Sequence, residues 1–282
     1  MKRLLNKITA VTVAFAAFAW AMLQAQHVEA AEIPFLFQGQ TCLEAGNDTF
    51  DFAVGDYNND GVMDIYAIKK YNTGTGTTEL HILDGSSNYQ SFLLQTGLSL
   101  ESGDNFRFAV GDYNDDGMAD LFAIKKNAGL SRCEVHMLDG SSGYSRFLEQ
   151  RVVQLEPADY WDFAVDDYNG DGRVDLYAVK KFTSSGKCEV HILDGSSGYG
   201  RFLEQRSLPL ETGSHFSFCT GDYNRDGRPD LYALKRKQTG TGTTEIHVLN
   251  GANGYQNFLQ QPGVKLEIGD NFVFVSYDYN HN

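Results

Sequence analysis

Residues 52–70 read FAVGDYNNDGVMDIYAIKK and contain the motif D-Y-N-x-D-G-x-x-D, which organises the whole chain. The motif occurs in four complete copies separated by 55 or 56 residues, beginning at Asp56, Asp112, Asp167 and Asp222. A broken fifth copy begins at Asp278. Self-similarity at a fixed period of this kind indicates an architecture of repeated structural units.

Each repeat contains four short segments with the composition of β-strands. In the second repeat they are Phe106 to Val110, Leu121 to Lys125, Glu134 to Leu138 and Phe147 to Leu155. The second segment is apolar on both faces, which predicts a strand buried on both sides. Four-stranded units with a period near 55 residues favour a β-propeller, in which the blades bury their faces against one another. The expected repeats are residues 50–105, 106–160, 161–215 and 216–271.

The two ends of the chain predict how the ring closes. Residues 35–38 align with the last strand of a repeat, and residues 272–279 align with the first strand of a repeat. We therefore expect an all-β propeller of four complete four-stranded blades plus a partial fifth blade, shared by residues 32–49 and 272–282. A minimal fifth blade, a truncated chain and a partner subunit that fills the gap remain alternatives.

The first thirty residues have the pattern of a secretory signal peptide. Lys2, Arg3 and Lys7 precede the apolar run from residue 8 to residue 23, and Val28-Glu29-Ala30 offers a cleavage site. The propeller is then expected to span residues 31–282 of a secreted protein that is extracellular, periplasmic or on the cell surface. The net charge of −14 argues against nucleic acid and anionic membranes as partners.

The repeated motif predicts about four Ca²⁺ sites. Oxygen-bearing side chains stand at positions 1, 3, 5 and 9 of each loop, glycine at position 6 permits the bend, and the carbonyl at position 7 adds a ligand. The loops contain no soft ligand, which favours calcium over zinc or copper. Solvated turns between strands are the alternative. The side-chain ligands expected are Asp56, Asn58, Asp60, Asp64, Asp112, Asn114, Asp116, Asp120, Asp167, Asn169, Asp171, Asp175, Asp222, Asn224, Asp226 and Asp230, and the carbonyl ligands are Val62, Met118, Arg173 and Arg228.

The combined pattern F-A-V-G-D-Y-N-x-D-G-x-x-D-L-Y-A-I-K-K followed by E-V-H-I-L-D-G-S-S-G-Y resembles the FG-GAP/VCBS repeat family over nearly all of residues 32–282. The resemblance implies a calcium-binding β-propeller like those of integrin α-chain heads, secreted lectins and carbohydrate-associated modules of bacterial hydrolases. It implies no single activity. Asp166 and Tyr277 depart from the glycine that precedes the motif elsewhere.

The sequence gives no sign of a catalytic motif. It contains no nucleophile elbow, phosphate-binding glycine loop or zinc-protease helix, and we find no carboxylate pair outside the repeat pattern. We therefore expect a protein that is not an enzyme. Aromatic rings beside polar turn residues could stack on sugars, although packing at the blade edge is an equally physical role. The candidates are Tyr89, Tyr144, Tyr199 and Tyr255.

These observations predict a secreted, calcium-binding propeller that acts as a lectin-like binding module for extracellular carbohydrate. Two other functions remain open: a protein–protein adhesion module that binds a cell-surface protein, and a stand-alone accessory domain of a secreted hydrolase. The sequence leaves oligomerisation possible, and it predicts no membrane association once the signal peptide is removed.

Overall fold

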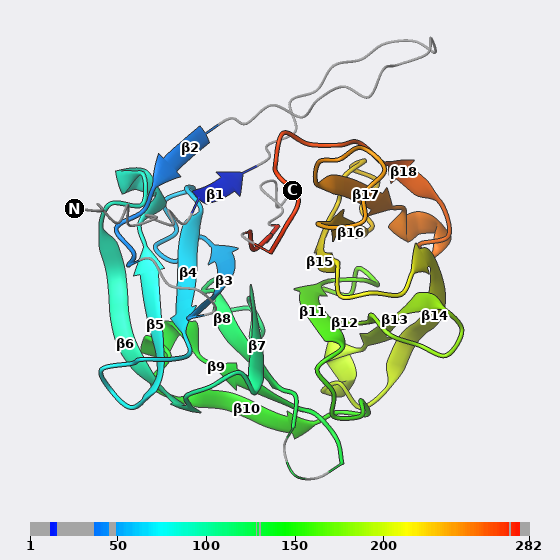
Figure 1. Cartoon of the computed structure of the whole chain (residues 1–282). Coiled ribbons are helices and arrows are strands. Elements are labelled where there is room, and N and C mark those ends of the chain that lie inside the picture. Colours follow the sequence, from blue (N-terminus) through cyan, green and yellow to red (C-terminus); the bar gives the residue numbers. More distant parts are fainter. Residues whose placement is uncertain are drawn as a thin grey trace, which may run out of the picture.

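The computed structural model describes residues 12–15, 37–44, 49–127, 129, 131–270 and 272–276. Four antiparallel sheets of four strands each are arranged in a ring (Figure 1). The prediction of an all-β propeller with four complete blades is therefore confirmed. No helix in the described part of the chain is long and apolar enough to cross a membrane.

Each blade is a meander whose strands follow one another in sequence. The first and second blades contain β3 (Phe50–Gly55), β4 (Asp64–Lys69), β5 (Thr77–Leu83) and β6 (Phe92–Glu101), then β7 (Phe106–Gly111), β8 (Asp120–Lys125), β9 (Glu134–Leu138) and β10 (Phe147–Val152). The third and fourth contain β11 (Trp161–Asp166), β12 (Asp175–Lys180), β13 (Lys187–Leu193) and β14 (Phe202–Glu211), then β15 (Phe216–Gly221), β16 (Asp230–Lys235), β17 (Glu245–Leu249) and β18 (Phe258–Gln260).

The apolar core lies between the blades, because each sheet must bury both of its faces. The second strand of each blade carries most of this burial; in β8 the first five residues are buried. One cluster joins Phe122 of the second blade to Trp161 and Leu176 of the third. The first strands of successive blades contact one another, β3 with β7, β7 with β11 and β11 with β15, so they are the innermost strands of the ring (Figure 1).

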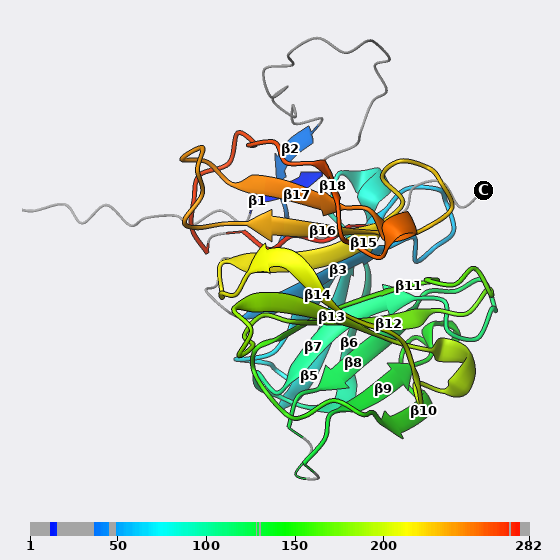
Figure 2. The same ribbon diagram turned by 90° about the vertical axis from the view of Figure 1, so that its right-hand side faces the viewer.

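Two sets of loops lie at the same end of every blade. The Asp loops connect the first and second strands, and short 3-10 helices follow the third strands: η1 (Gly85–Ser87), η2 (Gly140–Ser142), η3 (Gly195–Ser197) and η4 (Gly251–Asn253). Figure 2 shows the 3-10 helices on one face of the disc. Each helix begins against an Asp loop: a Cβ on Gly140 would lie 2.3 Å from the Ala119 carbonyl oxygen, so only glycine allows this close approach.

The partial fifth blade shared by the two termini is not found in the described residues. Strand β2 (Phe37–Gln40) pairs with β1 (Thr12–Phe15) in a separate two-stranded sheet, and residues 272–276 form no strand. Residues 272–276 instead fill the gap between the fourth and first blades (Figure 1): Phe272 and Phe274 pack on the fourth blade's core and Val275 on the first blade's core. The broken motif at Asp278 and nearly all of residues 1–30 lie outside the described residues.

Candidate functional site

The Asp loops fold alike, and hydrogen bonds to their own backbone hold them. In the second loop, the Asp116 N–H donates to Asp112 Oδ1 at 3.2 Å and the Gly117 N–H donates to Asp112 Oδ2 at 2.9 Å. Gly117 has φ +81°, a conformation that favours glycine. The Met118 N–H donates to Asp116 at 2.9 Å. The side chains at positions 1, 3 and 5 thus gather around a tight turn at the surface.

The aspartate at position 9 lies beneath each loop. The Asp120 carboxyl is fully buried and accepts the Tyr113 N–H at 3.0 Å and the Gly140 N–H at 2.8 Å, which joins the loop to η2. Burial, together with the charges of Asp116 and Asp112, raises the pKa of Asp120 to about 6. Asp175 and Asp230 have pKa values raised to about 6, mainly by the same burial. Each loop therefore holds carboxylates close enough to repel one another.

The donor set of the loops suits a hard cation, because every side-chain donor is a carboxylate or amide oxygen. In the conformation shown, no three acidic, histidine or cysteine side chains of the described residues lie close enough together to bind a metal. Asp112 uses both carboxylate oxygens to accept loop N–H groups. Calcium binding in these loops stays a prediction.

The four tyrosines expected to stack on sugars lie inside the propeller. Tyr144, Tyr199 and Tyr255 are at most 1% exposed and Tyr89 is 8% exposed. Each hydroxyl donates to the position-8 carbonyl of the Asp loop in its own blade, as Tyr144 does to Ala119 at 2.8 Å. Buried rings offer no face to a sugar, so the geometry supports the packing role that the sequence had left open.

We expect Tyr144→Phe to destabilise the protein by about 1–2 kcal/mol, because it removes the bond to the Ala119 carbonyl and leaves the buried Tyr66 hydroxyl without its 3.1 Å partner. Tyr66→Phe is the matched control. The second blade already carries Phe122 at the equivalent position, and Tyr144 would keep its carbonyl partner, so this variant should lose much less. Urea unfolding measures both, and equal losses would contradict the assignment.

The histidines that recur at one repeat position belong to the scaffold. His136 Nε2 lies 3.1 Å from Glu134, and its Nδ1 lies 3.4 Å from the Gln150 amide. The ring packs edge-on against Phe106. The same glutamate–histidine–glutamine arrangement recurs at His81, His191 and His247.

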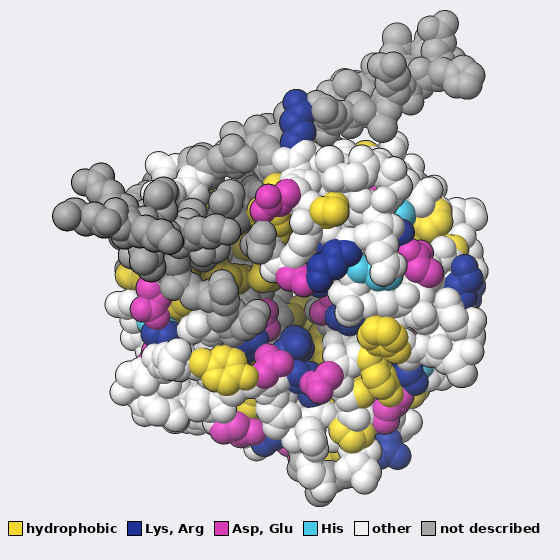
Figure 3. Space-filling model, in the orientation of Figure 1, with side chains coloured by type: hydrophobic (Ala, Val, Ile, Leu, Met, Phe, Trp, Pro, Cys, Tyr) yellow, Lys and Arg dark blue, Asp and Glu magenta, His cyan; other side chains and the backbone are white. Residues whose placement is uncertain are grey.

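A second group of charged residues lies where the innermost strands begin, at the end of the blades opposite the Asp loops. We call it the channel cluster. The second residue of each inner strand differs between blades: Asp51, Arg107, Asp162 and Ser217. The other members are Asp104, Lys70, Lys126 and Lys181. In Figure 3, acidic and basic side chains gather around the middle of this face.

Two carboxyl groups of the channel cluster have contrasting environments. Asp51 is half-buried, and desolvation raises its pKa, as does the charge of Asp162, against the opposing effects of Lys70 and Arg107. Among the residues that the structure describes, Asp51 forms no ion pair. Asp162 instead accepts the Phe218 N–H at 3.1 Å and lies 3.8 Å from the Lys181 Nζ. Desolvation thus favours the acid form of Asp51, whereas Asp162 has a backbone N–H donor and a lysine beside it.

Arg107 and Asp104 connect the cluster. Arg107 donates to Asp104 at 2.9 Å, and Asp104 also pairs with Lys70 at 2.8 Å and Lys126 at 3.3 Å. The pKa of Asp104 is held well below its usual range by these cations despite its partial burial. Asp104 is therefore an anion that positions the cations, which leaves Asp51 and Asp162 as the carboxyl groups available for chemistry.

Asp51 and Asp162 correct the statement that no carboxylate pair lies outside the repeat pattern. Their repeat position holds arginine in the second blade and serine in the fourth, so the pair breaks the periodicity. The signal was present in the sequence as variation at a channel-facing position of an otherwise regular repeat. The residues that all motif copies share give no sign of this carboxylate pair.

A search of the curated proteins gives no significant match. Among solved structures, an exo-β-1,3-galactanase of Phanerochaete chrysosporium with β-1,3-galactotriose aligns with a TM-score of 0.52 and 10% identity, over 81% of this chain and 54% of that one. An α-L-arabinofuranosidase of Podospora anserina with cellotriose aligns with a TM-score of 0.47 and 11% identity, over 79% and 80% of the two chains. The chain spans about half the length of the galactanase structures. At this identity the galactanase likeness shows a shared fold.

The likeness to the galactanase structure overturns the predictions of a protein without enzymatic activity and of a non-catalytic, lectin-like binding module. The prediction of a protein without enzymatic activity rested on the absence of a catalytic motif, whereas the galactanase of similar fold is an enzyme. It also depended on the absence of an independent carboxylate pair, which Asp51 and Asp162 provide.

The resemblance seen in the sequence is confirmed. The family model for an FG-GAP-like repeat matches residues 152–233, from the end of β10 into β16. The same order of strand, Asp loop, strands and 3-10 turn recurs in all four blades. The chain is a four-bladed β-propeller that contains an FG-GAP-like repeat at residues 152–233.

Proposed function

We propose that this chain is a glycoside hydrolase that uses Asp51 and Asp162 of the channel cluster. The observation that carries the proposal is the Asp51 carboxyl, whose pKa is raised by desolvation and which has a second carboxylate within electrostatic range. Hydrolysis of a glycosidic bond commonly uses one carboxylic acid and one carboxylate on either side of that bond. A carboxyl group whose pKa is raised by desolvation suits the role of the acid.

In the proposed reaction, protonated Asp51 donates its proton to the oxygen of the leaving sugar as the bond from that oxygen to the anomeric carbon breaks. The Asp162 carboxylate supports the positive charge that develops at the anomeric carbon. Water then supplies the hydroxyl of the product, and its remaining proton returns to the Asp51 carboxylate. The Phe218 N–H donates to Asp162 at 3.1 Å and Lys181 lies 3.8 Å from it, so both contacts position this carboxyl group. Arg107, which interacts electrostatically with both carboxyl groups, steadies their arrangement.

The first substrate to test is β-1,3-linked galactan, because the galactanase of similar fold was solved with β-1,3-galactotriose. We expect the full chain to release reducing sugar from this polymer, or from another member of a panel of plant and microbial glycans. Binding without any cleavage across the panel would instead favour the alternative of a stand-alone accessory domain of a secreted hydrolase.

We also propose that the four Asp loops bind calcium and that the protein works outside the cell on carbohydrate. The oxygen donors of the loops and the mutual repulsion of their carboxylates support the calcium proposal. The charge and apolar pattern of residues 1–30 supports secretion. Sequencing the N-terminus of protein collected from the culture medium tests it, and cleavage after Ala30 is the expected result.

A further inference from the structure

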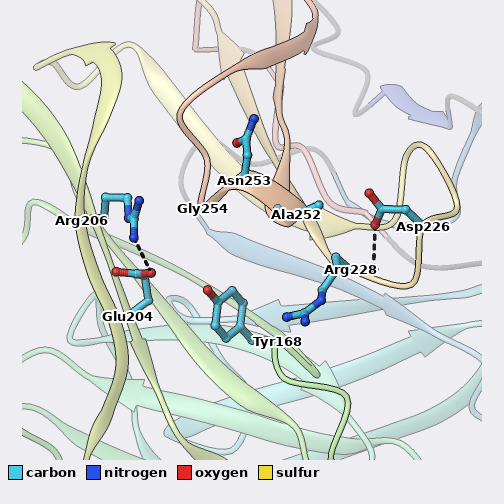
Figure 4. Close-up of a pocket in the computed structure, with 9 residues that line it drawn as sticks. Tyr168, Glu204, Arg206, Asp226, Arg228, Ala252, Asn253 and Gly254 are labelled. Atoms are coloured by element: carbon cyan, nitrogen blue, oxygen red, sulfur yellow. Dashed lines mark hydrogen bonds and ion pairs between the residues drawn. The ribbon is translucent and has the colours of Figure 1, made fainter.

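A polar pocket lies between the third and fourth blades, at the Asp-loop face and away from the channel cluster. Its volume is about 690 Å³. Tyr168, Glu204 and Arg206 line it from the third blade, and Asp226, Arg228 and Asn253 line it from the fourth (Figure 4). Strand β11 separates the two sites, because Asp162 stands near its start and the Asp loop follows its end. The pocket is therefore separate from Asp51, the proposed acid, and from Asp162, the proposed carboxylate.

A second pocket, of about 500 Å³, lies in the equivalent place between the second and third blades. Four of its charged and aromatic lining residues, Tyr113, Glu149, Arg151 and Arg173, are the repeat equivalents of Tyr168, Glu204, Arg206 and Arg228, whereas Asp226 lines only the first pocket. The two pockets can therefore be compared within one molecule, and the comparison shows which charges are already neutralised.

The two pockets differ in the partner of the arginine at loop position 7. Position 4 of one loop faces position 7 of the next: Asp115 pairs with Arg173 at 3.4 Å. The residue at position 4 in the third blade is Gly170, which has no side chain to offer Arg228. Within the part of the chain that the structure describes, the Arg228 guanidinium forms no ion pair, and in Figure 4 it points toward Tyr168.

The other polar groups of the pocket are arranged to recognise hydroxyl groups. Arg206 donates to Glu204 at 3.0 Å, which leaves further donors and acceptors on both side chains. The Arg206 guanidinium rests against Gly254, where a Cβ would lie 3.0 Å from its central carbon. Asn253 adds an amide at the pocket rim (Figure 4). The half-buried Tyr168 ring gives the pocket its apolar wall.

We propose that this pocket binds the acidic sugar of a saccharide chain, with the carboxylate of a uronic acid on Arg228. A guanidinium with no acidic partner matches a planar carboxylate with two parallel hydrogen bonds. The Glu204–Arg206 pair and Asn253 then receive the sugar hydroxyls. The choice of a saccharide rests on the proposed hydrolase function, and the pocket adds a class of ligand: a chain that carries negative charge.

The test uses the full chain in saturating Ca²⁺ and measures binding of a galacturonic acid trimer and of neutral galactotriose by isothermal titration calorimetry. We expect the acidic trimer to bind at least about tenfold more tightly, with an affinity that falls as salt rises. Arg228→Gln should remove this preference, whereas the matched variant Arg173→Gln should leave it unchanged. Equal binding of the two trimers by the wild type would overturn the proposal.

Exchanging the position-4 residues gives a sharper test. Gly170→Asp supplies the missing partner and should weaken binding of the acidic trimer about tenfold without touching Arg228. Asp115 has φ +57° at the equivalent position and Gly170 has φ +72°, so the loop accommodates aspartate there. Asp115→Gly frees Arg173 and should add a second binding site for the trimer. If neither exchange alters binding, Arg228 is not the recognition group.

Two further measurements distinguish this proposal from the proposed hydrolase function and from the recognition of a different anion. Asp51→Asn should slow hydrolysis by a factor of about 10² to 10⁴ and leave trimer binding intact, so failure of one proposal does not imply failure of the other. A galactotriose that carries sulfate esters distinguishes the anion: tighter binding of the uronate supports carboxylate recognition. Preference for the sulfated trimer would overturn the uronate assignment.

Discussion

Asp51→Asn is expected to slow hydrolysis of the preferred polysaccharide by a factor of about 10² to 10⁴, the usual contribution of a positioned acid. The amide keeps the size of the carboxyl group and can still accept the Phe52 N–H that Asp51 accepts at 3.1 Å. It cannot donate the proton that the leaving sugar requires. The change in turnover number is measured against the wild type by reducing-sugar release.

The loss should depend on the leaving group. A nitrophenyl glycoside leaves without protonation, so Asp51→Asn should slow its hydrolysis far less than that of the natural polymer. Asp162→Asn should impair both substrates, because the developing positive charge is the same in each. Asp270→Asn is the control: it removes an aspartate that pairs with Arg236 and Lys237, which are not members of the channel cluster. Equal losses with both substrates in Asp51→Asn would contradict its role as the acid.

The pH profile gives an independent readout. Burial raises the Asp51 pKa above its ordinary value of 3.8, so the protonated form persists to higher pH than in an exposed aspartate. Activity should therefore fall as the pH rises through the Asp51 pKa, and this limb of the profile should disappear in Asp51→Asn. If the fall in activity at high pH persists in Asp51→Asn, the titration of another group causes it.

The repeat made the fold predictable, and its regularity hid the candidate active site. Spacing and strand composition predicted every blade, because each copy must bury the same faces, as β8 does. A catalytic site that occurs once in the molecule cannot consist of residues that all four repeats share. Asp51 and Asp162 occupy a strand position that the other blades give to Arg107 and Ser217, and only the ring brings them together.

The tyrosines and the chain ends depend on three-dimensional packing that spacing does not encode. Tyr144 follows a polar turn and looks exposed in the sequence, yet the close approach of η2 to the Asp loop carries the ring inward. Residues 35–38 match a last strand, but β2 hydrogen-bonds to β1, for which the repeat offered no template. Sequence similarity between copies indicates what a segment resembles, and the available partner decides what it pairs with.

Removal of calcium is expected to be the largest stability effect in this protein. Four loops carry the motif, and a ligand at a hundredfold excess over its dissociation constant adds about 2.7 kcal/mol per site when it binds only the folded state. Chelation should then lower the free energy of unfolding by roughly 10 kcal/mol. In a chain of this size that corresponds to a fall in Tm of about 20 °C or more.

The stabilisation of the protein by calcium should increase as the pH rises. Without calcium, the pKa values of Asp120, Asp175 and Asp230 are raised to about 6 from 3.8, so their favourable contribution is complete below pH 3.8 and is lost as the pH rises through 6. Calcium requires the ionised carboxylates, so its own contribution grows over the same range. The difference in Tm between calcium and chelator should therefore be small at pH 5 and large at pH 7.5.

Calorimetric melting at both pH values, with calcium and with chelator, measures this difference. Burial lowers the pKa of His191 and His215, so these residues destabilise the fold as the pH falls below about 6.5. Their effect is common to both samples and cancels when the two melting temperatures are subtracted. Asp120→Asn should remove about a quarter of the calcium-dependent stabilisation, because it disables one loop of four, whereas Asp270→Asn should keep all of it. A chelated protein that melts at the calcium-loaded temperature at pH 7.5 would show that the loops fold as solvated turns, held by their own hydrogen bonds without a metal.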